Sequence, residues 1–236
     1  MAESGCPIAP DHDVQPSSIE HLVIIGHPSA DSFNHAIAAT YAESVRACGQ
    51  TAEVRDLYAI GFDPLLRASE RPEAAGFALS DDVRAELKIV ERASVIVLVY
   101  PVWFGMPPAI IKGYVDRVLG AGVTATAIRH NQHKGRLTGK RIVLLTTSGA
   151  TLPWLAERGQ WHGLKEAFDY YLEAIFGLSD CDHEHFDSIV SPLSPVYAAE
   201  CLERAAERSR QTCSVLLSAA HEAAKSCKLA RRQAQA

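Results

Sequence analysis

The stretch that decides the fold is Ala93–Leu119, which reads ASVIVLVYPVWFGMPPAIIKGYVDRVL. Its first part, Ala93–Tyr100, is an apolar run that ends at a proline and is typical of a buried strand. A helix is predicted from Pro107–Pro108 onward, because the first helical turn tolerates a residue without an N–H. Trp103 and Phe104 therefore fall on a short loop at the carboxyl end of a buried strand, where open α/β sheets bind ligands.

Strands and helices alternate along the rest of the chain. The other predicted strands are His21–Gly26, Thr51–Leu57, Arg141–Thr147 and Cys181–Phe186. Apolar residues at helical spacing separate them, and a long final helix follows Ser194–Pro195. Such alternation implies a parallel sheet that is covered by helices on both faces, with right-handed crossovers.

Length and composition fit one globular domain. The chain has 236 residues, of which 47% are hydrophobic and 22% charged, and its formal net charge of −5 gives no support for nucleic-acid binding. We predict a disordered leader over residues 1–19, a binding domain over 20–190, and a C-terminal helix and tail over 191–236 packed on the same domain.

The sequence also predicts a cytoplasmic protein without an integral membrane segment. No apolar run approaches the ~18 residues that a membrane-spanning helix needs. The first 19 residues contain acids and prolines and lack the apolar core of a secretory signal. The six cysteines are scattered without a CxxC pair and are interpreted as reduced thiols.

The loop after the first strand, Gly26–Asn34, begins a helix at Ser32. It matches neither GxGxxG nor a P-loop, so neither of those nucleotide sites is predicted. Free amides and the helix dipole at this terminus attract an anion, and the side chains of His27, Ser32 and Asn34 add polar groups. Plain helix capping by Ser32 explains the same residues, and the loop alone does not decide between the two.

Two further loops carry binding candidates. Pro101–Gly105 offers Trp103 and Phe104 as a platform for a flat ligand, with burial in the core as the alternative. Thr146–Ala150, TTSGA, offers hydroxyls and amides, with a simple tight turn as the alternative. The three loops converge if the strands take the flavodoxin-like order 2-1-3-4-5, in which strands one and three flank the switch point. A phosphate at the loop after strand one, a flat ring at the loop after strand three, and hydrogen bonds to that ring from the loop after strand four together describe a flavin site.

Five segments resemble the flavodoxin-like NAD(P)H:quinone reductase family, DT-diaphorase and its bacterial relatives. HPSADSFNHA resembles the family's H-P-x-x-x-S-F-N, and DLYAIGFDPLL resembles D-L-Y-x-x-x-F-x-P. The highly specific block YPVWFGMPPAIIKGYVDRVL resembles P-x-x-W-F-x-x-P-A-x-L-K-G-W-x-D-R-V-F. TTSGA is similar to the T-T-G-G loop and QWHG to G-x-H-G. The resemblance spans His21–Phe186.

The resemblance implies site residues by position. It assigns His27, Ser32, Phe33 and Asn34 to the flavin's phosphate arm, and Pro101, Val102, Trp103 and Phe104 to the isoalloxazine and ribityl. It assigns Thr146, Thr147, Ser148 and Gly149 to the pyrimidine end of the ring. It makes His162 the catalytic residue over the substrate face, where a histidine can donate a hydrogen bond or a proton to a reduced quinone oxygen.

The chain departs from the family pattern in two places. Only Val102 separates Pro101 from Trp103, and a second proline appears at Pro107–Pro108. Where the family has an aromatic G-F-A-Y segment, residues 122–127 read GVTATA. We therefore expect a wider or less aromatic acceptor pocket.

The resemblance implies a flavin-dependent NAD(P)H oxidoreductase that passes hydride through the flavin to a quinone or similar acceptor by ping-pong kinetics. FAD is favoured and FMN is the alternative cofactor, with NAD(P)H as co-substrate and a homodimer as the assembly. Two other functions stay open: an ancillary regulatory subunit of a potassium-efflux system, and a flavodoxin-type electron carrier.

One polar segment fits none of these roles. On a strand, Cys181, His183, His185 and Asp187 share one face and form a plausible set of metal ligands. A polar strand end at the sheet edge is the favoured alternative, because nothing elsewhere in the sequence completes a metal site. We therefore predict no metal.

Overall fold

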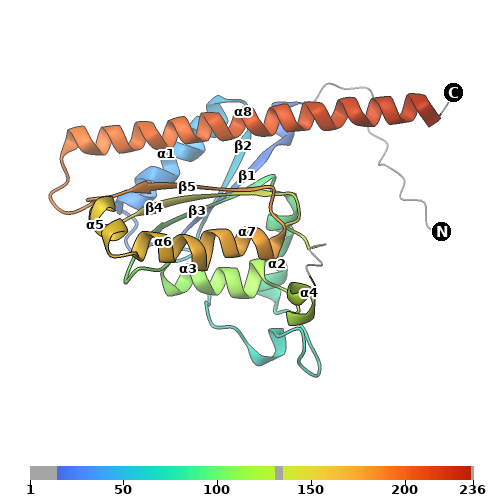
Figure 1. Ribbon diagram of the computed structural model, residues 1–236, viewed down its shortest axis with the longest axis horizontal. Coiled ribbons are helices and arrows are strands. Elements are labelled where there is room, and N and C mark those ends of the chain that lie inside the picture. The colour runs from blue at the N-terminus through green and yellow to red at the C-terminus, as the bar shows by residue number, and fades with distance from the viewer. Residues whose placement is uncertain (1–14, 131–134, 235–236) are drawn as a thin grey trace.

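A computed structural model describes residues 15–130 and 135–234, and it contains one five-stranded sheet in the order β2-β1-β3-β4-β5 (Figure 1). The strands are β1 (Glu20–Ile25), β2 (Thr51–Asp56), β3 (Val95–Pro101), β4 (Arg141–Thr147) and β5 (Asp180–Phe186). Every neighbouring pair is parallel. The predicted α/β fold and strand order are confirmed.

Helices cover both faces of the sheet. One face carries α1 (Phe33–Ala47) and α8 (Pro195–Ala234); the other carries α2 (Asp81–Arg92), α3 (Ala109–Tyr114) and α7 (Tyr171–Phe176). Three short helices, α4 (Ala125–Arg129), α5 (Leu152–Glu157) and α6 (Gln160–Leu164), lie near the two ends of the sheet (Figure 1). Short 3-10 turns span Pro16–Ser18 and Ala68–Glu70, and π-helical segments continue α3 (Val115–Leu119) and join α6 to α7 (Lys165–Tyr170).

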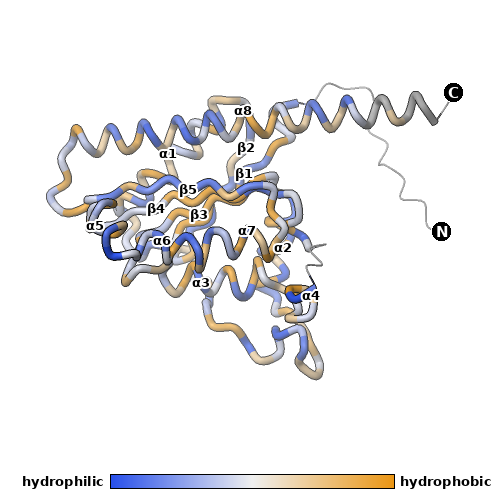
Figure 2. Tube along the Cα trace, in the orientation of Figure 1, coloured by the Kyte–Doolittle hydropathy of each residue, from blue (hydrophilic) through white to orange (hydrophobic). Residues whose placement is uncertain are grey.

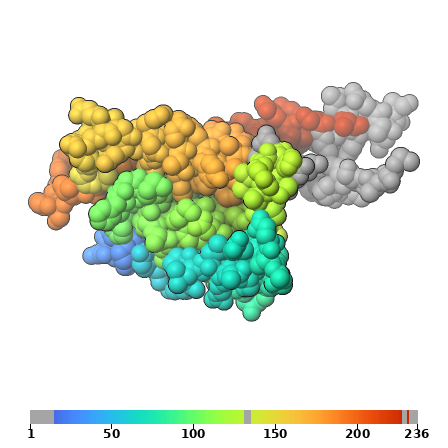
Figure 3. Space-filling view, turned by 60° about the horizontal axis from the view of Figure 1, so that its bottom comes forward, coloured from blue at the N-terminus to red at the C-terminus, as the bar shows by residue number. Residues whose placement is uncertain are grey.

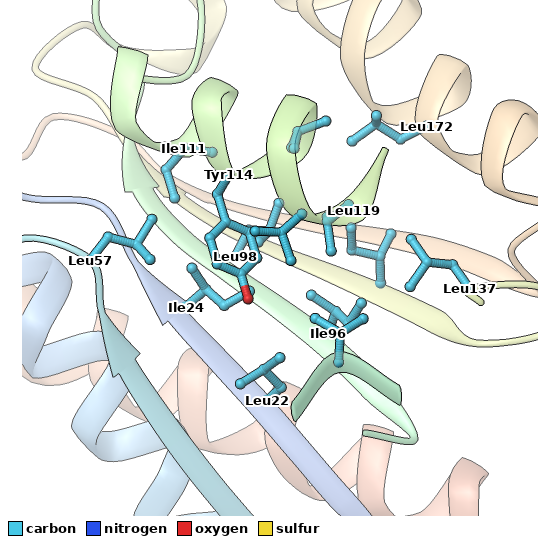
Figure 4. Packing of buried hydrophobic residues seen from close by; sticks show 14 of the residues in the cluster. Leu22, Ile24, Leu57, Ile96, Leu98, Ile111, Tyr114, Leu119, Leu137 and Leu172 are labelled. Atoms are coloured by element: carbon cyan, nitrogen blue, oxygen red, sulfur yellow. The ribbon is translucent and has the colours of Figure 1, made fainter. Parts of the chain in front are cut away.

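The core forms because apolar side chains alternate between the two faces of each buried strand. Toward α3 and α7 the strands and helices contribute Leu22, Ile24, Ile96, Leu98, Ile111, Tyr114, Leu119 and Leu172 (Figure 4). The opposite set, including Val23, Val97 and Val143, packs against α1 and α8. Figure 2 shows β3 and β4 as largely apolar segments between more polar outer helices, while β5 at the edge of the sheet is polar. Burial of each such side chain contributes about 1.5–3 kcal/mol.

At most of the strand ends, the boundary in the structure differs from the predicted boundary by one or two residues. β3 includes Pro101, which fits the last position of a strand because a proline there gives up no interior ladder bond. The pairing continues one residue further, since the Val102 amide donates to the Thr147 carbonyl at 2.7 Å. The helix predicted from Leu164 begins earlier, at Gln160, and α8 extends beyond the predicted apolar stripe to Ala234.

The two ends of the chain pack differently. Of the predicted leader, residues 1–14 lie outside the described residues, while Ile19 is buried directly before β1. The first part of α8 buries Cys201, Ala205, Ser209 and Cys213 against the domain, and its second part extends past the sheet (Figure 1). Within the described ranges, no helix is both long and apolar enough to span a bilayer.

Candidate active site

The loops that follow β1, β3 and β4 meet at the carboxyl edge of the sheet and enclose a cavity of about 150 Å³. Its lining comprises His27, Phe33, Asn34, Pro101, Val102, Trp103, Thr147, Ser148, Gly149 and Ile189. Most of the residues predicted to bind a cofactor are therefore brought together. Gly26 allows the first loop to approach α3, because a Cβ on it would lie 2.3 Å from the Ile111 side chain.

The amino terminus of α1 forms one wall of this cavity. Ser32 caps the helix through its Oγ, which accepts from the His35 amide at 3.4 Å and lies 2.8 Å from His35 Nδ1. In the described part of the chain, the amides of Phe33 and Asn34 donate to no protein acceptor. Two free amides at the positive end of a long helix suit an anionic group.

Asn34 also makes a contact that the sequence does not predict. Its side chain is buried, and its Nδ2 donates to Thr147 Oγ1 at 3.1 Å. This bond ties the loop after β1 to the loop after β4. The Asn34 side chain therefore fixes the relative position of two walls of the cavity, and its predicted contact with a cofactor stays a prediction.

A tight turn presents the two aromatic residues. Trp103 and Met106 exchange backbone hydrogen bonds of 3.1 Å, and Phe104 and Gly105 between them have φ values of 51° and 80°. This is the geometry of a type I′ turn, and a left-handed conformation is costly for phenylalanine. Trp103 is 42% exposed and Phe104 is fully exposed, so neither is a core residue. A strained turn that exposes two aromatic rings favours the platform interpretation.

His27 lies beside this platform, with its ring 5.6 Å from the ring of Trp103. Its Nδ1 accepts a hydrogen bond from the Ser29 amide at 3.0 Å. Burial lowers the pKa of His27 below its ordinary value, although its contact with the Ser29 backbone opposes this. Burial therefore favours the uncharged imidazole of His27, which can offer a ligand a hydrogen bond.

Thr146 lies outside the cavity, although the sequence places it with Thr147 and Ser148. Successive strand residues point to opposite faces, so Thr146 and Thr147 diverge. Thr146 Oγ1 lies 2.7 Å from His183 Nε2 and 2.7 Å from His185 Nδ1. His185 in turn places its Nε2 2.9 Å from Ser148 Oγ, which is at the cavity.

His183 and His185 are site-adjacent residues that the sequence prediction missed. Their alternation on β5 was the available signal, and it pointed to a metal or to a polar edge. The structure instead pairs His183 with buried Asp169, at 2.6 Å from Nδ1 to Oδ2. Among the described residues, no group of histidine, cysteine and acidic side chains is placed to hold a metal ion.

Three other predicted residues do not line the cavity. Ser32 acts as the helix cap, and Phe104 points into solvent. The side chain of His162 on α6 is 79% exposed, and its Nε2 is 3.9 Å from Glu166. The structure leaves His162 outside the enclosed volume and does not test its predicted role over the substrate.

The segment that replaces the family's aromatic residues is also remote from this cavity. Gly122, Val123 and Ala127 line a second cavity of about 410 Å³, together with Leu119 and Phe176. That cavity lies at the amino end of the strands, near α4. Figure 3 shows α4 and α5 at opposite ends of one face of the molecule.

Comparisons with known proteins agree with this geometry. The profile of a family described as having a flavodoxin-like fold matches residues 20–212. An uncharacterized NAD(P)H oxidoreductase of Haemophilus influenzae is 32% identical over 172 residues, which cover 72% of this chain and 85% of that protein. NAD(P)H dehydrogenase [quinone] 1 of Cavia porcellus is 32% identical over 148 residues, covering 55% of this chain and 53% of that protein, so the chain spans about half its length.

A comparison with solved structures finds the same fold. The solved NAD(P)H:quinone oxidoreductase of Methanothermobacter marburgensis superposes with a TM-score of 0.70 at 24% identity, covering 83% of this chain and 96% of that one. The family profile covers both faces of the sheet and all three loops that form the cavity. The chain therefore belongs to the flavodoxin-like NAD(P)H:quinone reductase family that its sequence motifs resemble.

Proposed function

We propose that this protein is a flavin-dependent NAD(P)H oxidoreductase that reduces a quinone or a similar small acceptor. The observation that carries the proposal is the cavity at the switch point between β1 and β3, with an exposed aromatic turn on one side and free helix amides on the other. Both relatives reported above are named for NAD(P)H, and the second is also named for a quinone.

The residues present fit a flavin. The amides of Phe33 and Asn34 suit its phosphate, the Trp103 ring suits a flat ring system, and Ser148 and Gly149 suit hydrogen bonds at the edge of that ring. When bound, a flavin supplies the two-electron chemistry that no side chain here can perform. The protein's own part is to bind and orient it, and to exclude water from the ring.

Three finer assignments belong to the same proposal. FAD is favoured over FMN by the similarity of HPSADSFN to the family motif, and a homodimer is expected from the family. A cytoplasmic location suits the thiols, because Cys48, Cys181, Cys201 and Cys213 are all unpaired. The relatives do not favour a channel subunit or a bare electron carrier as the function.

The direct test is to purify the protein, extract its cofactor, and measure NAD(P)H oxidation with a small quinone. We expect a yellow protein with a stoichiometric flavin and ping-pong kinetics. A colourless protein that binds neither FAD nor FMN would overturn the site assignment, and a flavin-loaded protein without turnover would overturn the enzymatic function.

Trp103→Ala tests the platform. Loss of aromatic stacking is worth about 1–3 kcal/mol for a flat heterocycle, so we expect flavin affinity to fall roughly 10- to 100-fold. The free energy of unfolding of the flavin-free protein should change by less than about 1 kcal/mol, because the ring is 42% exposed. Trp154→Ala is the matched control, since Trp154 is 43% exposed and outside the cavity lining. Equal loss of stability and flavin affinity would favour a structural role for Trp103.

A further inference from the structure

A buried chain of hydrogen bonds leads from the helix layer to the candidate flavin cavity. It runs from Asp169 to His183 at 2.6 Å, from His183 to Thr146 at 2.7 Å, from Thr146 to His185 at 2.7 Å, and from His185 to Ser148 at 2.9 Å. We call these five residues the β5 histidine relay. Each link is of hydrogen-bond length, so the relay is continuous from end to end.

The relay is closed to solvent along its length and reaches a cavity at its Ser148 end. The side chains of His183 and Asp169 are 0% and 1% exposed. The Trp161 ring covers both imidazoles, with centroids at 4.7 Å from His183 and 4.9 Å from His185. Ser148 alone among the five lines the candidate flavin cavity. Anything that enters or leaves along the relay at this end passes through the site.

Counting hydrogens shows that the relay has two complete bonding patterns. In the neutral pattern Ser148 donates to His185 Nε2, His185 Nδ1 donates to Thr146, and Thr146 donates to His183 Nε2, while His183 Nδ1 donates to Asp169. Each hydroxyl donates once and each imidazole carries one proton. Every donor and acceptor between the ends is then paired.

The second pattern reverses the three bonds between Ser148 and His183, keeps the bond from His183 Nδ1 to Asp169, and contains one more proton. Ser148 then donates to the Ala150 carbonyl, which lies 2.8 Å from its Oγ, and accepts from His185 Nε2. Thr146 donates to His185 Nδ1 and accepts from His183 Nε2. His183 is now doubly protonated and faces the Asp169 carboxylate. The two patterns use the same heavy-atom positions, so the proton can be gained or lost without rearrangement.

The surrounding charges place the extra proton at the far end. Burial, and then the neighbouring His183, lower the pKa of His185 to about 4, with Arg204 from α8 in the same sense and Asp187 and Glu184 opposing. A second proton is therefore not held on His185. The second pattern places it on His183, whose Nδ1 faces the buried Asp169 carboxylate at 2.6 Å; Lys165 Nζ lies 3.6 Å from the same carboxylate oxygen.

We propose that the β5 histidine relay is a proton store for the oxidoreductase site, taking up one proton when the site is reduced and returning it through Ser148 to the acceptor. The inference rests on the proposed function. Its chemistry balances: NAD(P)H gives a hydride, which is two electrons and one proton, and a quinone needs two electrons and two protons to become a hydroquinone. The relay takes up the second proton, which comes from water, while the site is reduced, and it gives this proton to the quinone on reoxidation, which returns the relay to its neutral pattern.

In this proposal His183 and His185 are positioning residues, because they act through Ser148. The exposed His162 is not required to carry the second proton. In this proposal the relay also places a compensating positive charge on His183 whenever the site gains negative charge, and burial of His183 limits the screening of that charge by water.

The sharpest test is Thr146→Val, which breaks the middle of the relay and leaves both histidines in place. In the flavin-loaded protein, the dependence of the midpoint potential on pH reports how many protons are taken up per two electrons. We expect the variant to take up one proton fewer than the wild type, and its reoxidation by quinone to slow about tenfold, a loss within the range of general acid catalysis.

Thr212→Val is the matched control, because Thr212 is also buried but bonds to the Arg208 carbonyl within α8. It should leave proton uptake as in the wild type. Equal proton uptake in Thr146→Val and the wild type would overturn the relay. His185→Gln provides a second variant, since an amide preserves a donor and an acceptor but cannot pass a proton, and it should also lose one proton of uptake.

A measurement on the flavin-free protein separates failure of the relay from failure of the proposed function. Nitrogen NMR of the imidazoles should show both histidines protonated at Nδ1 at high pH. On acidification, His185 should change its tautomer to Nε2–H at the pH where His183 gains its proton, and Thr146→Val should abolish this coincidence. If the two histidines of the wild type changed at different pH values, the relay would be overturned, whether or not the protein binds flavin. If they changed together but the protein bound no flavin, only the proposed function would be overturned.

Discussion

Two buried histidine networks lie on opposite faces of the sheet. The His21 network joins His21 on β1 to Tyr41, Gln50 and Cys213 on the side of α1 and α8. The β5 histidine relay lies on the side of α7. Burial lowers the pKa of His21 and of His185 to about 4 alike. The residue type, the burial and the lowered pKa therefore do not distinguish His21 from His185.

The difference lies in where each network ends. His21 Nδ1 is 3.1 Å from the Tyr41 hydroxyl, and its Nε2 is 2.8 Å from Gln50 Oε1. Gln50 then donates to the Cys213 carbonyl of α8 at 2.9 Å, so the network closes on the backbone of a packed helix. The relay ends instead on Ser148 at a cavity. A closed network stabilises the fold, and an open one can exchange a proton with a ligand.

His21→Ala should have the largest effect on stability and none on the site. It leaves a cavity and removes the partners of two buried polar groups, which together cost about 4 kcal/mol in the free energy of unfolding. Chemical denaturation measures this loss. Flavin affinity and proton uptake should match the wild type. His185→Ala is the comparison, because it should lower stability and also remove one proton of uptake; a change of proton uptake in His21→Ala would erase the distinction between the networks.

The pH dependence of stability gives the next largest effect. The folded pKa of His21 is lowered from 6.5 to about 4, so the unfolded chain binds more protons between these values and stability falls as the pH drops from 6.5 toward 4. A shift of this size is worth about 3 kcal/mol. His21→Gln should therefore lose about 3 kcal/mol less than the wild type when urea denaturation is compared at pH 7 and pH 4. An unchanged pH dependence in this variant would show that His21 is not held neutral by burial.

The fold could be predicted from the sequence because buried parallel strands are continuous apolar runs. Arg141–Thr147 is predicted with the boundaries that β4 has. The alternation of apolar runs and helical patterns predicts the parallel sheet, and the strand order follows from the arrangement in which the three binding loops converge. The strained aromatic turn could also be located, because Trp103 and Phe104 stand between a proline-ended strand and a helix. What the pattern did not reveal is that Phe104 itself adopts a positive φ.

The relay could not be predicted for a physical reason. His183 and His185 meet Thr146 only because β4 and β5 pair with Thr146 opposite His185, and this register is set by packing in three dimensions. Asp169 comes from a π-helical segment, whose wider turn changes which residues face the sheet. The alternation His183-Glu184-His185 is visible in the sequence, but the residues that contact the two histidines are not. The sequence alone therefore suggests a metal site or a polar strand at the sheet edge.

The smallest effects come from one hydroxyl in each network, those of Tyr41 and Ser148, and they separate the networks most cleanly. Tyr41→Phe removes the group beside His21 Nδ1, where Tyr41 is fully buried and water cannot replace it, so the free energy of unfolding should fall by about 1–2 kcal/mol. Ser148→Ala removes the corresponding group at the cavity, where a water can take its place, so stability should change by less than about 1 kcal/mol.

When function is measured instead of stability, Ser148→Ala should have the larger effect and Tyr41→Phe the smaller. Ser148→Ala should slow reoxidation by quinone and alter its pH profile, because a replacement water passes protons less directly than a fixed hydroxyl, while Tyr41→Phe should leave both unchanged. Stopped-flow reoxidation at several pH values measures this directly. If Tyr41→Phe changed reoxidation and Ser148→Ala did not, the endpoint of a network would not decide its role, because the two hydroxyls differ chiefly in whether a cavity lies beyond them.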